Sequence, residues 1–160
     1  MQSLELPALD RLDRRILNLV QENNLLSHRV IADNVGLSTP AVTRRLQRLR
    51  KIGVIRKDVS LLDAPSLGRP LVVIAEVLLH SERIQDIDSL RKVFLDCPQV
   101  QHCYYVTGEA DFVLVFSLRD MAEYEQLTRQ LFFDSDNVRR FKTLVAMETI
   151  KAASDVVITP

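Results

Sequence analysis

The sequence has few of the features that mark secreted or membrane-spanning proteins. Its two cysteines, Cys97 and Cys103, are too few for a disulfide framework in 160 residues, so we expect a reducing, cytoplasmic setting. No apolar run approaches the ~18 residues of a membrane span. Charged residues interrupt positions 1–25 throughout, which is not typical of a signal peptide. These absences favour a cytoplasmic globular protein with one domain or two small ones.

The sequence also lacks the residue patterns of a catalytic or metal-binding site. Its three histidines lie in different predicted elements, at positions 28, 80 and 102, and no nucleophile has a base at a suitable spacing. Cys97, His102 and Cys103 are close in sequence, but Pro98 and the strand after it point them in different directions. A buried thiol is a commoner role for such cysteines than metal binding. We therefore expect no metal, no cofactor and no enzymatic activity.

The net charge of zero conceals two halves of opposite sign. Residues 1–60 carry 11 Lys and Arg against 6 Asp and Glu, whereas residues 61–160 carry 10 against 15. A basic segment joined to an acidic one indicates a module that binds a polyanion, followed by a module with a different task.

Residues 1–60 have the pattern of three helices. Asp10 is suited to cap the first, with Asp13 favouring the positive end of that helix. An apolar stripe at helical spacing then comprises Leu12, Ile16, Leu19 and Val20. Ser27 is suited to cap a second helix, which Gly36 would end in a left-handed conformation. Ser38 is suited to cap a third, because Pro40 is tolerated in a first turn.

The third helix concentrates positive charge on one face. Five of the eight residues from Arg44 to Lys51 are basic, and residues 38–52 contain no acid. The spacing predicts a buried seam of Val42, Leu46 and Leu49. The opposite face comprises Arg44, Gln47, Arg48 and Lys51, with Thr43 and Pro40 near its border, while Arg45 lies on the flank, where it can pair structurally. A helix face that is merely solvated would normally mix Glu with Lys, so this face favours a polyanion.

Beyond Gly53 the pattern changes. Residues 54–62 suit a short extended segment that carries Arg56 and Lys57, and residues 63–70, DAPSLGRP, form a linker. Strands are predicted at 71–79, 100–108, 111–118 and 138–150. Helices are predicted at 84–97, with Ile84, Ile87, Leu90 and Phe94 inward, and after Asp120, with Met121, Tyr124, Leu127 and Leu131 inward. This β-α-β-β-α-β order predicts an α+β protein with a ferredoxin-like second domain.

The predicted sheet has no polar face. Its two helices would cover one side, yet strands 71–79 and 111–118 are apolar on both sides. Such a sheet requires a partner, most simply a second copy of the chain, so we expect homodimerisation.

Several segments together resemble the Lrp/AsnC (feast/famine) family of transcriptional regulators. They are LDRLDRRIL (9–17), IADNVGLS (31–38), RRLQRL (44–49), GVI (53–55), VTGEADFVL (106–114) and VAMETIK (145–151). The resemblance covers nearly the whole chain. It implies a winged helix-turn-helix domain at 1–62, a linker at 63–70, and an amino-acid-sensing, oligomerising domain at 71–160. It also implies dimers that assemble into octamers, with effector pockets between subunits.

The resemblance places two sets of functional residues on this chain. The recognition helix matches residues 39–52, and we expect contacts to double-stranded DNA from Ser38, Thr39, Pro40, Thr43, Arg44, Gln47, Arg48, Lys51, Arg56 and Lys57. Of these, Thr39, Pro40, Thr43 and Arg44 are expected nearest the base edges, and Arg48, Lys51, Arg56 and Lys57 at phosphates. The effector positions match Val106, Thr107, Gly108, Glu109, Ala110, Asp111, Met121, Leu144, Val145 and Ala146.

An amino-acid effector needs donors for its carboxylate and an acceptor for its ammonium group. Gly108 permits close backbone approach, and Asp111 is a suitable ammonium acceptor. Where family members commonly read GDxD, this chain reads Gly108-Glu109-Ala110-Asp111, so the effector is left unspecified. From the residues alone, Gly108 and Asp111 also fit a plain hairpin turn.

Two other functions remain open at the level of sequence. Lrp-like sirohaem decarboxylases share the two-domain plan and would show a tetrapyrrole absorbance band. An effector-binding module without DNA contact is the second alternative. The acid-free basic face at 38–52 favours the regulator, which would act in the cytoplasm and associate with the nucleoid when bound to DNA.

Overall fold

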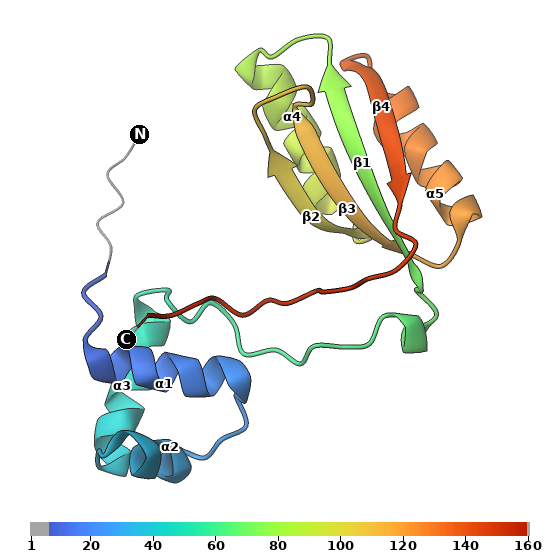
Figure 1. The fold of residues 1–160 in the computed structure, drawn as a ribbon. Helices are drawn as coiled ribbons and strands as arrows, with labels where there is room; N and C mark the ends of the chain where they lie inside the picture. Colours follow the sequence, from blue (N-terminus) through green and yellow to red (C-terminus); the bar gives the residue numbers. More distant parts are fainter. Residues whose placement is uncertain (1–6, 160) are drawn as a thin grey trace. The chain divides into compact units, whose positions relative to one another are not determined.

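The computed structural model describes residues 7–159, and the chain divides into two compact units (Figure 1). One contains the chain up to Leu61 together with the segment from Ala152 onward; the other runs from Leu62 to Lys151. The sequence assigns that final segment to the second domain, so the structure groups it differently.

The first helix of the amino-terminal unit begins as its capping residues predict. α1 (Arg11–Glu22) follows Asp10, whose carboxylate accepts a hydrogen bond from the Asp13 backbone N–H at 2.8 Å. The Asp13 carboxylate in turn accepts one from the Asp10 N–H at 3.1 Å. This reciprocal pair is a capping box, which satisfies backbone donors that have no partner within the helix.

The second and third helices also begin where the sequence places them. α2 (His28–Val35) follows Ser27, whose hydroxyl accepts from the Val30 N–H, and ends at Gly36 with a φ of 73°. α3 (Thr39–Lys51) follows Ser38, but the Ser38 hydroxyl makes no capping hydrogen bond. The three helices share one core, made of Ile16, Ile31, Ala32, Val35, Val42 and Leu46.

The segment from Ala152 belongs to this unit because it lies along α1. The Gln21 side-chain amide donates to the Val156 carbonyl and accepts from the Val156 N–H, both at 3.0 Å. Arg14 donates to the Thr159 carbonyl at 3.3 Å. One side chain thus pairs with both backbone groups of Val156, as a neighbouring strand would.

The carboxy-terminal unit confirms the β-α-β-β-α-β order. Its elements are β1 (Leu71–Leu79), α4 (Ile84–Asp96), β2 (Val100–Tyr105), β3 (Phe112–Leu118), α5 (Met121–Thr128) and β4 (Val138–Val145). A short 3-10 turn, η1 (Pro65–Leu67), precedes β1, and a π-helical turn, η2 (Arg129–Phe133), extends α5. The sheet has the order β2-β3-β1-β4, and every neighbouring pair is antiparallel.

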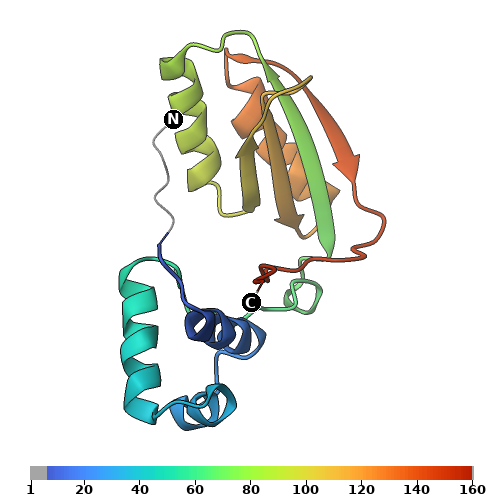
Figure 2. The ribbon, with the colours of Figure 1, turned by 60° about the vertical axis from the view of Figure 1, so that its left-hand side comes forward.

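Both α4 and α5 cover the same face of this sheet (Figures 1 and 2). Buried side chains of β1 and β3 alternate along each strand and pack against Ile87, Leu90 and Phe94 of α4 and Tyr124 and Leu127 of α5. Ile84 and Met121, predicted inward, are instead largely exposed. Each is the first residue of its helix, and contact with the sheet begins one turn later.

Two predicted strands are shorter in the structure: the second ends at Tyr105 rather than at residue 108, and the last ends at Val145 rather than at residue 150. The extended segment predicted at 54–62 forms no strand. β4 ends opposite the beginning of β1, since Val145 pairs with Val73 and the Ala146 N–H donates to the Val72 carbonyl. A strand needs a partner for its backbone groups, and neither residues 54–62 nor residues 146–150 join a strand ladder in the described part of the chain.

Candidate DNA-binding and effector-binding sites

The exposed face of α3 carries the residues predicted to contact DNA. Val42, Leu46 and Leu49 are buried as expected, which turns Arg44, Gln47 and Lys51 outward. Ser38, Thr39 and Pro40 are exposed just before and within the first turn, whereas Thr43 is half-buried. Arg56 and Lys57 are exposed in the segment that follows α3.

Three basic residues of α3 are paired with acids. Arg45 Nη1 contacts Asp10 Oδ2 at 2.6 Å and Asp13 Oδ1 at 2.8 Å, which confirms its structural role. Arg48 Nη2 contacts Asp13 Oδ2. Arg50 Nε contacts Asp58 Oδ2 at 3.0 Å.

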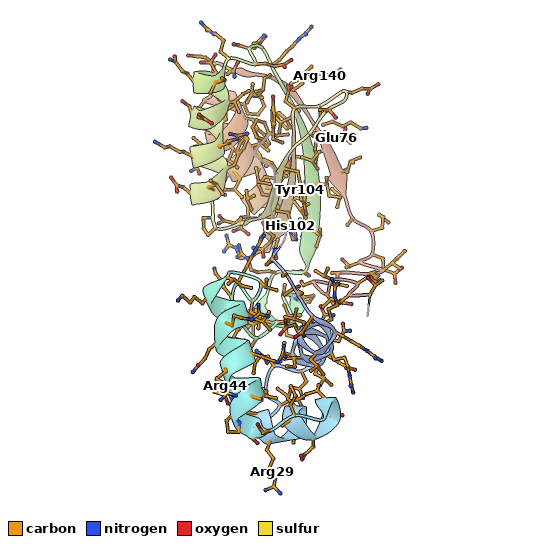
Figure 3. All side chains as sticks on the ribbon, turned by 90° about the vertical axis from the view of Figure 1, so that its left-hand side faces the viewer. Arg29, Arg44, Glu76, His102, Tyr104 and Arg140 are labelled. Carbon is orange, nitrogen blue, oxygen red and sulfur yellow. The ribbon has the colours of Figure 1, made fainter. Side chains whose placement is uncertain are left out.

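Arg44 and Lys51 have no acidic partner among residues 7–159, so the uncompensated charge of α3 lies on these two side chains. Arg29 of α2, which the sequence reasoning did not single out, is also exposed and lies toward the same end of the unit as Arg44 (Figure 3). The sequence does contain the feature that could have identified Arg29: it is a basic residue in the first turn of α2, the helix that precedes α3.

Asp13 fixes α3 against α1. Its side chain is 1% exposed, and its two oxygens accept hydrogen bonds from Arg45, Arg48 and the Asp10 N–H. A buried carboxylate is tolerated only when its oxygens are satisfied in this way. The Asp13 N–H and the Arg45 guanidinium lower the pKa of Asp10, and Asp10 and Asp13 raise the pKa of Arg45.

Sequence reasoning assigned Asp13 only to the helix end. The signal for its burial was present, because Asp13 lies three residues before Ile16 and four before Leu17, the spacing of one buried helix face.

An open groove of about 690 Å³ lies beside the basic face. It is lined by Ala8, Leu9, Asp10, Asp13, Leu37, Ala41, Arg44, Arg45 and Arg48. Both carboxylates of the α1 cap line it and bind two of its three arginines. The groove therefore contributes one uncompensated cation, Arg44, to the exposed face.

The predicted effector turn, Val106–Asp111, joins β2 to β3. The Val106 N–H donates to the Asp111 carbonyl at 2.9 Å, and Gly108 has a φ of 138°, a conformation that favours glycine. Thr107 and Glu109 are exposed and Ala110 is half-buried.

Asp111 has a structural task in this turn. The β1–β3 ladder ends at the pair Val77–Phe112, which leaves the Leu79 N–H without a partner on β3. Asp111 Oδ2 accepts from that N–H at 2.7 Å, and the Asp111 N–H donates to the Val77 carbonyl at 2.9 Å. The hairpin role and an acceptor role at Oδ1 are therefore compatible.

The other predicted effector residues lie at the opposite end of the sheet. Leu144 pairs with Ile74 and the Ala146 N–H donates to the Val72 carbonyl, whereas Asp111 is bound to Val77 and Leu79. Met121 follows β3 at that same far end, where Leu118 pairs with Leu71. Val72 and Val77 are five residues apart on a strand, roughly 17 Å at 3.3–3.4 Å per residue, so one amino-acid ligand cannot contact both sets in one chain.

The cysteines and histidines do not gather into a site. Cys97 is buried and its thiol donates to Gln99 Oε1 at 3.4 Å, while burial raises the pKa of the half-buried Cys103. Within residues 7–159 no three His, Cys, Asp or Glu side chains are grouped to hold a metal ion.

No helix in the described part of the chain is long and apolar enough to cross a membrane.

The comparisons with known proteins match both units. The winged helix-turn-helix DNA-binding family matches residues 9–56, and the Lrp/AsnC ligand-binding domain matches residues 72–156. An uncharacterized HTH-type transcriptional regulator of Sinorhizobium fredii is 44% identical over 90% of this chain and 85% of its own length. The leucine-responsive regulatory protein of Haemophilus influenzae is 32% identical over 94% of this chain and 91% of its own.

Solved structures agree with these matches. An AsnC family transcriptional regulator from Agrobacterium tumefaciens has a TM-score of 0.88 at 31% identity, over 93% of this chain and 97% of its own. A transcriptional regulator from Neisseria meningitidis, solved with L-Met, shares the fold at a TM-score of 0.87 and 24% identity, over 94% of this chain and 97% of its own. The helix-turn-helix, the α+β fold and these relatives agree: the chain belongs to the Lrp/AsnC family of helix-turn-helix transcriptional regulators.

Proposed function

We propose that this regulator binds a near-palindromic DNA site as a dimer, with α3 in the major groove, and that a small amino acid modulates its DNA binding. The observation that carries the proposal is the acid-free exposed face of α3, where Arg44 and Lys51 lack acidic partners among the described residues. A bound polyanion would supply the negative charge that the protein itself does not place beside these two side chains.

The residues of α3 divide into base readers and phosphate contacts. The N-terminal part of a recognition helix enters the groove deepest, so Thr39, Pro40, Thr43 and Arg44 are assigned to base edges. Lys51, Arg56 and Lys57 are assigned to phosphates. Ser38 and Gln47 are exposed beside them. Because Asp13 holds Arg48, we assign Arg48 to positioning α3, a change from the phosphate role that its place on the helix predicts.

The uncovered face of the sheet supports a dimer. The side chains opposite the helices are Val72, Ile74, Glu76 and Leu78 of β1, Val113, Val115 and Ser117 of β3, His102 and Tyr104 of β2, and Arg140, Lys142 and Leu144 of β4. Glu76 is its one acid and contacts Lys142 at 3.5 Å, and the His102 and Tyr104 rings stack at 6.0 Å (Figure 3). A second copy would cover the apolar side chains that β1 and β3 place on this face, and Lys142 compensates the charge of Glu76 beside them. Octamers built from such dimers belong to the same proposal.

The separation of the two effector sets supports a pocket between copies. Asp111 lies at one end of β1, and Met121 and Leu144–Ala146 at the other. A pocket with both sets needs the turn of one copy beside the Leu144–Ala146 segment of another. The complex of the Neisseria meningitidis regulator with L-Met supports an amino acid as the ligand.

We assign no enzymatic role to the chain, since its relatives are transcriptional regulators. Its place of action is the cytoplasm, with association to the nucleoid when it is bound to DNA. The domains are assigned as 1–62, a linker at 63–70, and 71–160. The segment from Ala152 follows the second domain in the sequence but belongs to the amino-terminal compact unit.

Binding to DNA selected from a random library tests the proposal. Arg44→Ala should weaken binding by about 1–3 kcal/mol and relax specificity at one base pair per half-site, whereas Lys57→Ala should weaken binding to all sequences alike and reduce the salt slope by about one. Arg91→Ala, on α4, is the matched control. Equal, sequence-independent losses for Arg44→Ala and Lys57→Ala would contradict the assignment of Arg44 to a base edge.

A further inference from the structure

The side chain of Thr43 is held by two hydrogen bonds. Its Oγ1 lies 3.0 Å from the Thr39 carbonyl oxygen, four residues back on α3, and 2.8 Å from Nδ1 of His28, the first residue of α2. A hydroxyl has one hydrogen and two lone pairs. The Thr39 carbonyl can only accept, so the Thr43 hydrogen must point to it, and His28 Nδ1 must be the donor to Thr43. The reverse assignment would set oxygen lone pairs of Thr43 and Thr39 against each other.

These two contacts fix the orientation of Thr43. A threonine in a helix divides between two side-chain rotamers because its hydroxyl has a choice of partners. Here the hydroxyl is bound within α3 and to α2 at once, which selects one rotamer. The hydroxyl therefore has no hydrogen left to donate to a base, and the γ-methyl is the remaining group of this half-buried side chain with which Thr43 could contact one.

We propose that Thr43 reads a thymine through its γ-methyl group, and that His28 is the positioning residue that holds it in that orientation. A threonine methyl against the thymine C5-methyl is an apolar major-groove contact. This inference rests on the proposed placement of α3 in the major groove. It names the type of base at one operator position and gives a role to His28, which does not itself touch the base.

Deoxyuridine substitution isolates this contact, because deoxyuridine pairs like thymidine but lacks the C5-methyl group. Each thymine of the selected DNA site is replaced singly, and the affinity ratio of thymine to deoxyuridine is measured. One position per half-site should show a ratio of roughly four, the affinity equivalent of burying one methyl group. Replacement in both half-sites should multiply the two ratios, to roughly 15.

Variants of Thr43 and His28 then test whether these two residues cause the thymine-to-deoxyuridine affinity ratio. Thr43→Ser keeps the hydroxyl and removes the methyl, so the ratio should fall to one at that position alone. His28→Ala should lower the ratio with DNA binding retained, and His28→Asn, whose side-chain amide can donate from a similar place, should restore it. His80→Ala, at an exposed histidine of the other unit, should change nothing.

The outcomes separate this inference from the proposed function. DNA binding with a ratio of one at every thymine, or with a ratio that Thr43→Ser leaves intact, would overturn the thymine contact and leave the regulator standing. A ratio lost in Thr43→Ser but kept in His28→Ala would overturn the role of His28. No sequence-specific binding at all would overturn the proposed function and this inference with it.

Discussion

Asp13 shows how one buried side chain can set the orientation of a DNA-binding helix. Its two oxygens join the start of α1 to Arg45 and Arg48 of α3, and Asp10 adds a further contact to Arg45. Arg48, which the helical projection places on the exposed basic face, and Arg45 on its flank are thereby bound to acids of the protein. α3 is thus held against α1 by Arg45 and Arg48, and Arg44 has no acidic partner among residues 7–159.

Asp13→Asn should loosen this arrangement. The change removes the charge that binds Arg45 and Arg48 and should cost about 1–3 kcal/mol, less than a fully buried ion pair, because Arg45 keeps Asp10 and the Arg48 side chain is 44% exposed. Amide hydrogen exchange of the α1 and α3 peptides should therefore accelerate strongly. Asp33→Asn, at an exposed acid of α2, is the control and should leave exchange unchanged. Equal exchange in both variants would show that Asp13 does not hold α3.

The pKa of Glu123 makes the stability of the carboxy-terminal unit depend on pH. Its buried carboxylate accepts from the Arg119 N–H at 2.8 Å and contacts Gln99 and Arg69, each at 3.2 Å. The Arg119 N–H is the largest cause of its lowered pKa, followed among the lowering contacts by Gln99 and Arg69. Its stabilising effect is complete above the unfolded pKa of about 4.5 and is lost as pH falls through the lower folded pKa.

Glu123→Gln should lower the stability of the folded protein at pH 7 by about 1–3 kcal/mol, because the amide keeps an acceptor and loses the charge. The variant should also lose less stability than the wild type between pH 5 and pH 3. Thermal unfolding across that range measures both effects. Glu125→Gln, at an exposed ion pair with Arg129, should stay within about 0.5 kcal/mol of the wild type. Parallel pH curves for wild type and Glu123→Gln would refute this role.

At the scale of elements, the turn Val106–Asp111 combines a structural task with the proposed ligand contact. Asp111→Ala removes the acceptor of the Leu79 N–H and should cost about 1–3 kcal/mol of stability. Asp111→Asn keeps an acceptor oxygen and removes the charge that would bind an ammonium group.

We expect Asp111→Asn to fold and to bind DNA normally without ligand, yet to lose the response to the amino acid. Calorimetry with the cognate amino acid and the full chain measures the loss of binding. Glu82→Gln, at an exposed acid of the same unit outside the turn, is the matched control. Unchanged affinity in Asp111→Asn would place the ammonium group elsewhere.

The sequence predicted those parts of the fold that local patterns determine. The start of α1 followed from Asp10 and Asp13, and the buried seam of α3 followed from the spacing of Val42, Leu46 and Leu49. The predictions that were wrong concern features that depend on a partner far away in the sequence. The extent of β4 depends on where β1 begins, and the exposure of Ile84 and Met121 depends on where each helix meets the sheet.

The same limit applies to the candidate sites. The basic face of α3 could be read from the sequence because helical spacing defines a face. That Arg48 is held by Asp13, and that His28 donates to Thr43, could not be read, since each contact joins two helices. The separation of Asp111 from Leu144–Ala146 likewise depends on the direction of β1, β3 and β4 in the sheet.

At the scale of the whole molecule, assembly and DNA binding should depend on the same surface. Val115 lies on the uncovered face of the central strand β3, opposite Ile74. Val115→Lys should weaken dimerisation, because it would bury a charge in an apolar interface. It should also weaken operator binding, because two reading helices need one dimer to space them.

Light scattering and DNA binding of Val115→Lys, measured at the same protein concentrations, test this link. Lys92→Glu, a charge change on the exposed side of α4, is the control. A Val115→Lys protein that remains dimeric would move the interface to another surface. A monomer that binds the full site as tightly as the wild type would remove the need for a dimer.

The proposed effector must control the affinity of this protein for DNA. A ligand can do so only by binding one arrangement of subunits more tightly than another. The direct measurement is the affinity of the full chain for its selected DNA site, with and without each of the twenty amino acids in turn. A typical coupling of about 1–3 kcal/mol predicts a change of roughly 5- to 150-fold for at least one of them, abolished in Asp111→Asn. Unchanged DNA affinity with all twenty would show that no amino acid modulates the DNA binding of this protein.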